Sequence, residues 1–252
     1  MEVIDQLGRR VVVPSSPHRI ISLVPSQTEL LIDMGLEKEI VGVTKFCVHP
    51  QGFKESVTII GGTKNFHFDK IKSLNPDLII GNKEENYEEG IDKLAKDFPV
   101  WVSDIYELED ALDMMKKLGD LTDRNVEAER IINLVEYGFR RDFFYKGTVV
   151  YLIWNDPIMV AGKDTFIDCM LEKAGYTNLI EKSRYPELSV EEIKDLNPET
   201  VLLSSEPFPF KEKHLEEFKR KFPYSNVKLV DGEMFSWYGS RLIKAPEYFE
   251  RL

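Results

Sequence analysis

A cysteine and two histidines lie close together early in the sequence, and they are the first residues that could do chemistry. Cys47 and His49 are two positions apart, so an extended loop would direct both side chains to one side, and His67 lies in the next predicted loop. No CxxC or HExxH motif accompanies them. A metal-ligand role for His49 and a structural role before Pro50 are therefore both open.

Nucleophilic catalysis has little support in the sequence. There is no G-x-S-x-G motif, and Cys47 and His49 are too close in sequence to indicate a dyad. An enzyme that uses Cys47, His49, Lys64 and Glu84 is the remaining catalytic alternative. We prefer a binding role, in which Lys64 and Arg241 contact a carboxylate or phosphate group of a ligand, and we expect a protein that is not an enzyme.

Aromatic side chains gather in loops that follow predicted strands. Such rings suit flat, partly apolar ligands, because they offer a large contact area and lose little conformational entropy on binding. The segment SWYGSR, residues 236–241, is the clearest case, since glycine and serine beside two aromatics indicate a close-fitting loop. The alternative is that the rings pack beneath the loops as core. The aromatic candidates for ligand binding are Phe46, Phe66, Trp154, Phe208, Trp237 and Tyr238.

The composition excludes several classes of partner. The formal net charge is −11, with 44 acidic residues against 33 basic ones, and such a surface repels nucleic acid and anionic lipid. The two cysteines fall in different halves of the chain and are too few for a disulfide framework. No apolar run reaches the length of about 18 residues that spans a membrane. The two other histidines, His18 and His214, are expected at the surface.

The chain contains an internal repeat. Residues 71–80 read IKSLNPDLII and residues 193–202 read IKDLNPETVL. Proline disfavours helical geometry in the residue before it, so each copy predicts a helix, an Asn-Pro turn and a strand that is buried on both faces. Residues 19–36 and 148–176 also share the order strand, loop, helix, and both helices should end near a glycine. The repeat predicts two similar parallel-sheet α/β lobes.

A helical segment separates the two halves. Apolar residues recur at helical spacing through residues 107–146, and a break near Asp120 to Asp123 should start a fresh helix. A helix from Asp123 to Tyr145 would be about 34 Å long and would join the lobes as a stiff strut. The alternative is an ordinary pair of surface helices. The predicted domains are residues 1–106, 107–146 and 147–252.

A helix start in the first half marks a candidate ligand position. Ser26 precedes Glu29 by three residues, which is typical of a capping box. The helix would begin at the carboxyl end of a strand, where α/β sheets bind ligands, and its free N–H groups would favour an anion. A cap without any ligand is the common alternative.

The sequence resembles class III ABC-transporter substrate-binding proteins, the helical-backbone metal receptors. SLVPSQTELL, IVGVT, IKSLNPDLII and AGKDTFIDCMLEKAG are similar to the cobalamin-binding branch. The resemblance implies two α/β lobes joined by one long backbone helix, with the ligand in a cleft between the lobes. It implies no intrinsic cofactor, and a ligand that is cobalamin, another corrinoid, an iron-siderophore or haem. His49, Thr63 and Met234 stand where the cobalamin binder has tyrosine or tryptophan. These differences are compatible with a chelate other than cobalamin.

The resemblance also implies a partner and a location. An ABC permease would dock on one acidic side chain per lobe, and Glu88 matches the first position, whereas Ser236 stands at the second with Glu233 nearby. We expect a monomer that works in the periplasm or at the cell surface. The first residues, MEVIDQLGRRVVV, do not read as a secretory signal. A cytoplasmic cofactor carrier or sensor of the same fold is therefore the alternative.

Overall fold

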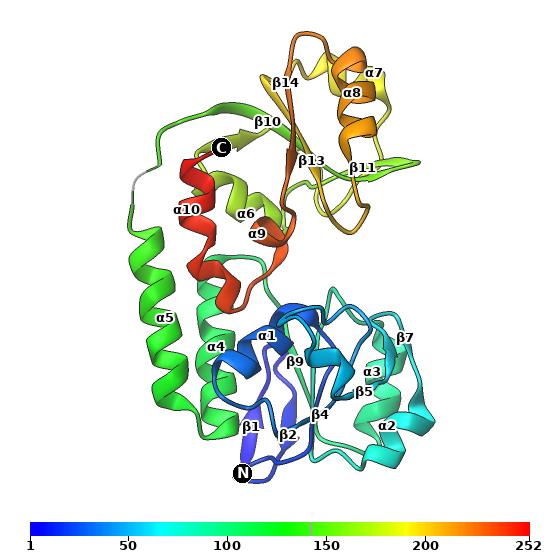
Figure 1. Ribbon diagram of the computed structural model, residues 1–252, viewed down its shortest axis with the longest axis vertical. Coiled ribbons are helices and arrows are strands. Elements are labelled where there is room, and N and C mark those ends of the chain that lie inside the picture. Colours follow the sequence, from blue (N-terminus) through cyan, green and yellow to red (C-terminus); the bar gives the residue numbers. More distant parts are fainter. Residues whose placement is uncertain (142) are drawn as a thin grey trace. The chain divides into compact units, whose positions relative to one another are not determined.

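The computed structural model describes residues 1–141 and 143–252 and divides into two compact units (Figure 1). We call them the first and the second lobe. None of the helices in the described ranges is long and apolar enough to pass through a bilayer. The first lobe comprises Met1–Ile105, Glu109–Glu136 and Tyr238–Arg241, and the second comprises Tyr106–Leu108, Tyr137–Trp237 and Leu242–Leu252.

The first lobe is built on a five-stranded sheet in which every strand runs parallel to its neighbours. Three of the strands consist wholly of buried residues, which explains why they read as continuous apolar runs. Helices pack against β3, β4 and β9. Across the sheet the strands are β5 (Thr58–Ile59), β4 (Ile40–Val43), β3 (Ile20–Ser22), β8 (Leu78–Asn82) and β9 (Val100–Ser103), and the helices are α1 (Pro25–Asp33), α2 (Phe68–Leu74) and α3 (Glu88–Ala95).

Two small antiparallel hairpins and one 3-10 turn also belong to the first lobe. The first hairpin joins β1 (Glu2–Ile4) to β2 (Arg10–Val12). The second joins β6 (Gly61–Gly62) to β7 (Asn65–Phe66) and carries Lys64 at its turn. The 3-10 turn η1 (Phe53–Glu55) lies in the long connection after β4.

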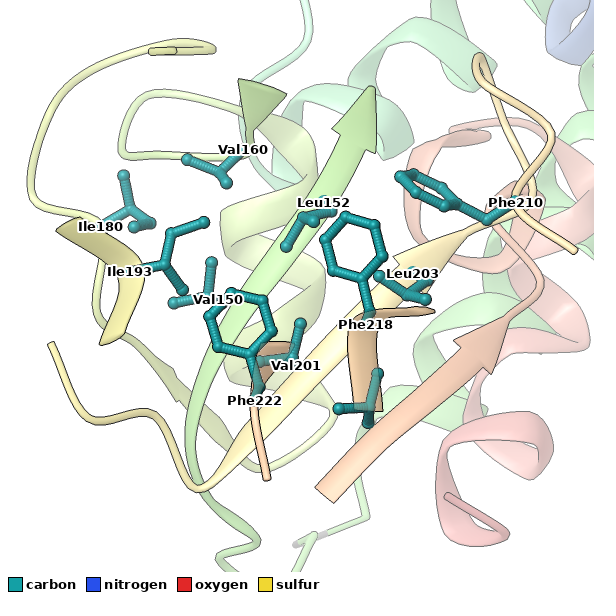
Figure 2. Close-up of a cluster of buried hydrophobic side chains, with 11 residues drawn as sticks. Val150, Leu152, Val160, Ile180, Ile193, Val201, Leu203, Phe210, Phe218 and Phe222 are labelled. Atoms are coloured by element: carbon teal, nitrogen blue, oxygen red, sulfur yellow. The ribbon is translucent and has the colours of Figure 1, made fainter. Parts of the chain in front are cut away.

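The second lobe repeats this plan with one departure. Its sheet is parallel except for β11, which pairs antiparallel with the end of β10. Figure 2 shows Phe210 and Phe218 near Leu152 and Leu203, and Phe222 beside Val150 and Val201, in its core. The strands are β11 (Ile158–Val160), β10 (Gly147–Asn155), β13 (Thr200–Ser204) and β14 (Asn226–Val230), with β12 (Tyr176–Asn178) beside the start of β10; the helices are α6 (Phe166–Lys173), α7 (Val190–Asp195), α8 (Glu212–Lys221), α9 (Glu233–Ser236) and α10 (Ala245–Glu250). The 3-10 turn η2 (Ser240–Ile243) begins in the first lobe and ends in the second.

The internal repeat has the predicted structure in both lobes. Asn75 follows α2 with φ 44°, and Asn197 follows α7 with φ 51°, so each asparagine ends its helix in the left-handed conformation before the proline. The second pair of segments agrees as well, because α1 and α6 are each followed by a left-handed glycine, Gly35 and Gly175. The prediction of two similar α/β lobes is confirmed.

The helical segment between the sheets differs from the predicted strut. It forms two helices of 15 residues each, α4 (Leu108–Thr122) and α5 (Asn125–Phe139), and Asp123 with φ 56° separates them. The prediction of one helix up to Tyr145 is wrong, and its residue 142 lies outside the described residues. Lys146 N–H donates to the Gly175 carbonyl at 2.8 Å, so the chain is already extended where it enters the second sheet.

Candidate ligand-binding site

The carboxyl edge of the first sheet is formed by loops that are tied to one another. Asn86 is buried, and its Nδ2 donates to the carbonyls of Thr63 at 3.1 Å and Leu23 at 3.4 Å, while its Oδ1 accepts from Asn82 N–H at 2.9 Å. One side chain thus joins the β6–β7 hairpin to the ends of β3 and β8. No sequence motif points to Asn86; only its place after a buried strand could have indicated it.

Lys64 strengthens the same connection. Its Nζ donates to the carbonyl of Glu84 at 2.5 Å and to that of Asn86 at 3.4 Å. The ammonium group therefore holds the hairpin against the loop that follows β8, and contact between Lys64 and a ligand stays a prediction. Burial, together with the neighbouring Glu84 carboxylate, raises the pKa of Glu85 above its ordinary value.

The two aromatic candidates of the first lobe differ in exposure. Phe46 is 49% exposed on the loop after β4, with the Lys45 ammonium 5.0 Å from its ring centroid. Phe66 is buried, and its ring lies 4.9 Å from that of Tyr87 and 6.2 Å from that of Phe68. Phe46 therefore presents an aromatic face at this edge, whereas Phe66 packs under the loops.

The cysteine and histidines of this region do not form a reactive group. Cys47 is fully buried, with its Sγ 3.1 Å from Thr28 Oγ1 and 3.4 Å from Thr44 Oγ1. Burial raises the pKa of the Cys47 thiol, so it stays protonated and a poor nucleophile. His49 is half-buried before a cis proline, and His67 is exposed. Within residues 1–141 and 143–252 no three His, Cys, Asp or Glu side chains are placed to hold a metal ion.

The start of α1 differs from the predicted capping box. The N-cap residue is Val24, and Pro25 takes the first helical position that suits its fixed φ, so Ser26 lies inside the helix. The Glu29 carboxylate instead accepts from Arg241 Nε at 2.9 Å and from a second guanidinium nitrogen at 2.7 Å. This geometry gives no support to a ligand contact by Arg241, because its guanidinium is committed to a buried ion pair.

The carboxyl edge of the second sheet carries an aromatic cluster. Trp154, near the end of β10, is 39% exposed, and its ring centroid lies 5.6 Å from that of Phe208, which follows β13. The Phe208 ring in turn packs on Phe210 and His214, with ring centroids 4.8 Å and 5.2 Å away. The expected surface position is confirmed for His18 but is wrong for His214, which is only 8% exposed because this cluster covers it.

Trp237 and Tyr238 are both buried. Trp237 Nε1 donates to the Glu206 carboxylate at 2.9 Å, and Ser236 Oγ donates to the same oxygen at 2.5 Å. Glu206 was not among the sequence candidates, although an acidic residue before a proline in a loop that follows a strand could have suggested it. Trp237 is thus fixed in orientation, and contact between a ligand and either aromatic stays a prediction.

Glu88 lies at the first position of α3 and is exposed. An acidic residue there stabilises the positive end of the helix dipole, which gives Glu88 a role that needs no partner. Ser236, which the resemblance places at the second docking position, is hydrogen-bonded to Glu206. Docking of a permease on Glu88 therefore stays a prediction.

These features define a class of protein: α/β lobes that present aromatic side chains at the sheet edges where parallel strands bind ligands. The model of the periplasmic binding protein family matches residues 20–230, and the chain belongs to this family. The predicted resemblance to substrate-binding proteins is confirmed, and the match agrees with a binding protein more than with an enzyme.

Known relatives extend over nearly the full chain. It is 25% identical over 264 residues to the uncharacterized ABC transporter substrate-binding lipoprotein YvrC of Bacillus subtilis (strain 168), with 96% of this chain and 82% of that protein covered. It is 22% identical over 242 residues to the vitamin B12-binding protein of Pectobacterium carotovorum subsp. carotovorum (strain PC1), with 92% and 86% covered.

A solved structure agrees with the fold. The crystal structure of a possible iron-binding (periplasmic solute-binding) protein from Staphylococcus epidermidis ATCC 12228 superposes with a TM-score of 0.79. The two sequences are 25% identical, and the superposition covers 94% of this chain and 98% of that one. The predicted fold class is therefore confirmed at the level of the lobes.

Proposed function

We propose that this protein captures a metal chelate and delivers it to an ABC importer. Candidate ligands are cobalamin or another corrinoid, an iron-siderophore and haem. Membership of the periplasmic binding protein family supports a binding role, and two similar proteins are named for vitamin B12 and for iron. The YvrC relative is named as an ABC transporter substrate-binding lipoprotein, which supports a permease partner and a site of action outside the cytoplasmic membrane.

The observation that carries the proposal is the exposure of large rings at the carboxyl edges. Phe46 in the first lobe and Trp154 in the second are 49% and 39% exposed, although both are large hydrophobic side chains. Exposed aromatic faces on a loop and near the end of a strand offer a flat ligand a prepared apolar contact. In this proposal Phe46, Trp154 and Phe208 supply the apolar contact to the ligand. The protein acts as a monomer, and Glu88 contacts the permease.

Direct titration tests the proposal. We expect cyanocobalamin, haemin or a ferric siderophore to bind with a dissociation constant in the micromolar range or below, measured by isothermal titration calorimetry with about 50 µM protein. Trp154→Ala should weaken binding about tenfold, because the ring contact is lost. Tyr224→Ala is the matched control, since Tyr224 is 96% exposed but precedes β14 at the opposite edge of the sheet. Absence of heat with all three probes would overturn the proposal.

We also propose His49 as a ligand to the metal of the bound chelate. If the half-buried imidazole coordinates the metal of a bound haemin, His49→Ala should shift the visible absorption bands of the complex while the protein stays folded. His67→Ala is the control, because that side chain is exposed one loop away. Identical spectra for wild type and His49→Ala would leave His49 without this role.

A further inference from the structure

His214 occupies the third position of α8 and accepts a hydrogen bond at its start. Lys211 N–H donates to His214 Nδ1 at 2.9 Å, and His214 N–H donates to the Lys211 carbonyl at 2.8 Å. This reciprocal pair satisfies backbone groups that a helix start would otherwise leave open. Only an imidazole whose Nδ1 carries no proton can accept this bond.

The same imidazole supports the exposed ring of the carboxyl edge. The His214 ring centroid lies 5.2 Å from that of Phe208 and 5.7 Å from that of Phe210. Phe208 lies edge-on to Trp154, with ring centroids 5.6 Å apart. An uninterrupted series of ring contacts therefore connects the buried helix start to the partly exposed Trp154.

We propose that His214 is a positioning residue for the Trp154–Phe208 surface, and that its protonation loosens this surface and lowers ligand affinity as the pH falls. The ligand part of this inference rests on the proposed function. Protonation places a hydrogen on Nδ1, so a donor then faces the Lys211 N–H and the helix start loses its acceptor. A cation at this end of the helix also opposes the dipole. Phe208 and Trp154 lose the support of a fixed ring.

Burial and the surrounding charges set the direction in which the pKa of His214 shifts. Burial lowers the pKa of His214, and the charges of Lys213 and Lys211 lower this pKa further, while Glu217 acts in the opposite sense. The Glu217 carboxylate is itself paired with Lys221 at 2.6 Å. The imidazole is therefore neutral at pH 7 and becomes charged only below its ordinary pKa of about 6.5.

Two acidic residues stand on the other segments that pack against this cluster. Glu206, on the loop of Phe208, accepts from Ser236 and Trp237. Asp156, on the turn after β10, accepts the Trp154 indole N–H at its backbone carbonyl, at 3.1 Å.

The experiment begins without ligand. The chain has four histidines, so their ring protons can be titrated individually by NMR, and Trp154→Phe identifies the contribution of Trp154 to the fluorescence of the three tryptophans. We expect the Trp154 emission to change between pH 8 and pH 5 with the midpoint of the His214 titration. His214→Asn places an oxygen acceptor near the position of Nδ1 without a titrating group, and its emission should stay constant.

A second variant moves the midpoint instead of removing it. Lys213 is exposed, so Lys213→Ala should fold normally and should raise the His214 midpoint, and the emission midpoint should rise with it. An emission change that does not follow His214 in this variant would overturn the proposal, whatever the folding of His214→Asn. Constant wild-type emission while His214 titrates would overturn it as well.

Ligand binding supplies the last measurement. With cyanocobalamin as probe, affinity of the wild type should fall about threefold to tenfold between pH 7.5 and pH 5.5, and affinity of His214→Asn should not. Equal pH dependence in both proteins would overturn the effect of His214 on affinity. Absence of binding at every pH would reject this probe, while the emission measurements still decide the role of His214.

Discussion

At the scale of single residues, the charged side chains that suggested ligand binding form hydrogen bonds and ion pairs within the protein itself. Lys64 holds two loops together through backbone carbonyls, and Arg241 is paired with Glu29. A sequence shows which residues carry charge, but it does not show that residues 29 and 241, which are 212 positions apart, share a buried contact. The exposure of the aromatics could not be predicted either, since Phe46 and Trp154 are partly exposed whereas Phe66, Trp237 and Tyr238 are buried.

The Glu29–Arg241 pair leads to a stability prediction. Glu29→Gln should lower the free energy of unfolding by about 3 kcal/mol, because it removes a buried counter-charge of the Arg241 guanidinium. Glu2→Gln is the matched control, since Glu2 pairs with Arg10 at the surface and should cost less than about 1 kcal/mol. Urea denaturation followed by circular dichroism measures both, and equal effects would contradict the buried pair.

At the scale of elements, the repeat predicted helix, turn and strand in both lobes because the Asn-Pro turn acts locally. The left-handed φ of Asn75 and Asn197 follows from two neighbouring residues and needs no tertiary information. The end of α5 could not be predicted in this way. Lys146 is already hydrogen-bonded to Gly175, next to the pairing of β10 with β12, so the helix has to end before this point.

The left-handed asparagines can be tested directly. Asn75→Val should destabilise the protein by about 1–2 kcal/mol, because a β-branched side chain is strained at positive φ, and Asn75→Gly should be nearly neutral. Asn197→Val and Asn197→Gly repeat the comparison in the second lobe. Thermal unfolding monitored by circular dichroism reports the differences. Equal melting temperatures for the valine and glycine variants would show that the turn has no such strain.

At the scale of the whole molecule, the acidic composition makes stability depend on pH. Hydrogen bonds from the Ser189 backbone and side chain lower the pKa of Glu192, and a hydrogen bond from Lys221 lowers that of Glu217. A carboxyl whose pKa is lower in the folded state stabilises the protein above its ordinary pKa and loses this contribution in acid. Glu85 acts in the opposite sense, since its pKa is raised.

We therefore expect the urea midpoint to fall as the pH drops from 5 to 3, because more groups lose than gain stabilisation in this range. Glu192→Gln should flatten the curve, since the capping residue of α7 no longer titrates. Glu191→Gln, one position earlier and exposed, is the control. A midpoint that rises throughout this range would contradict the expectation.

The segment Tyr238–Arg241 belongs to the first lobe, although almost all of the last hundred residues belong to the second. Neither lobe is consequently one unbroken stretch of chain. Residues 1–136 expressed alone would lack the partner of Glu29, and a gene fragment cut between the sheets would encode an incomplete domain. Adding a synthetic peptide that contains residues 237–243 should restore part of its stability, which makes this protein suited to fragment complementation.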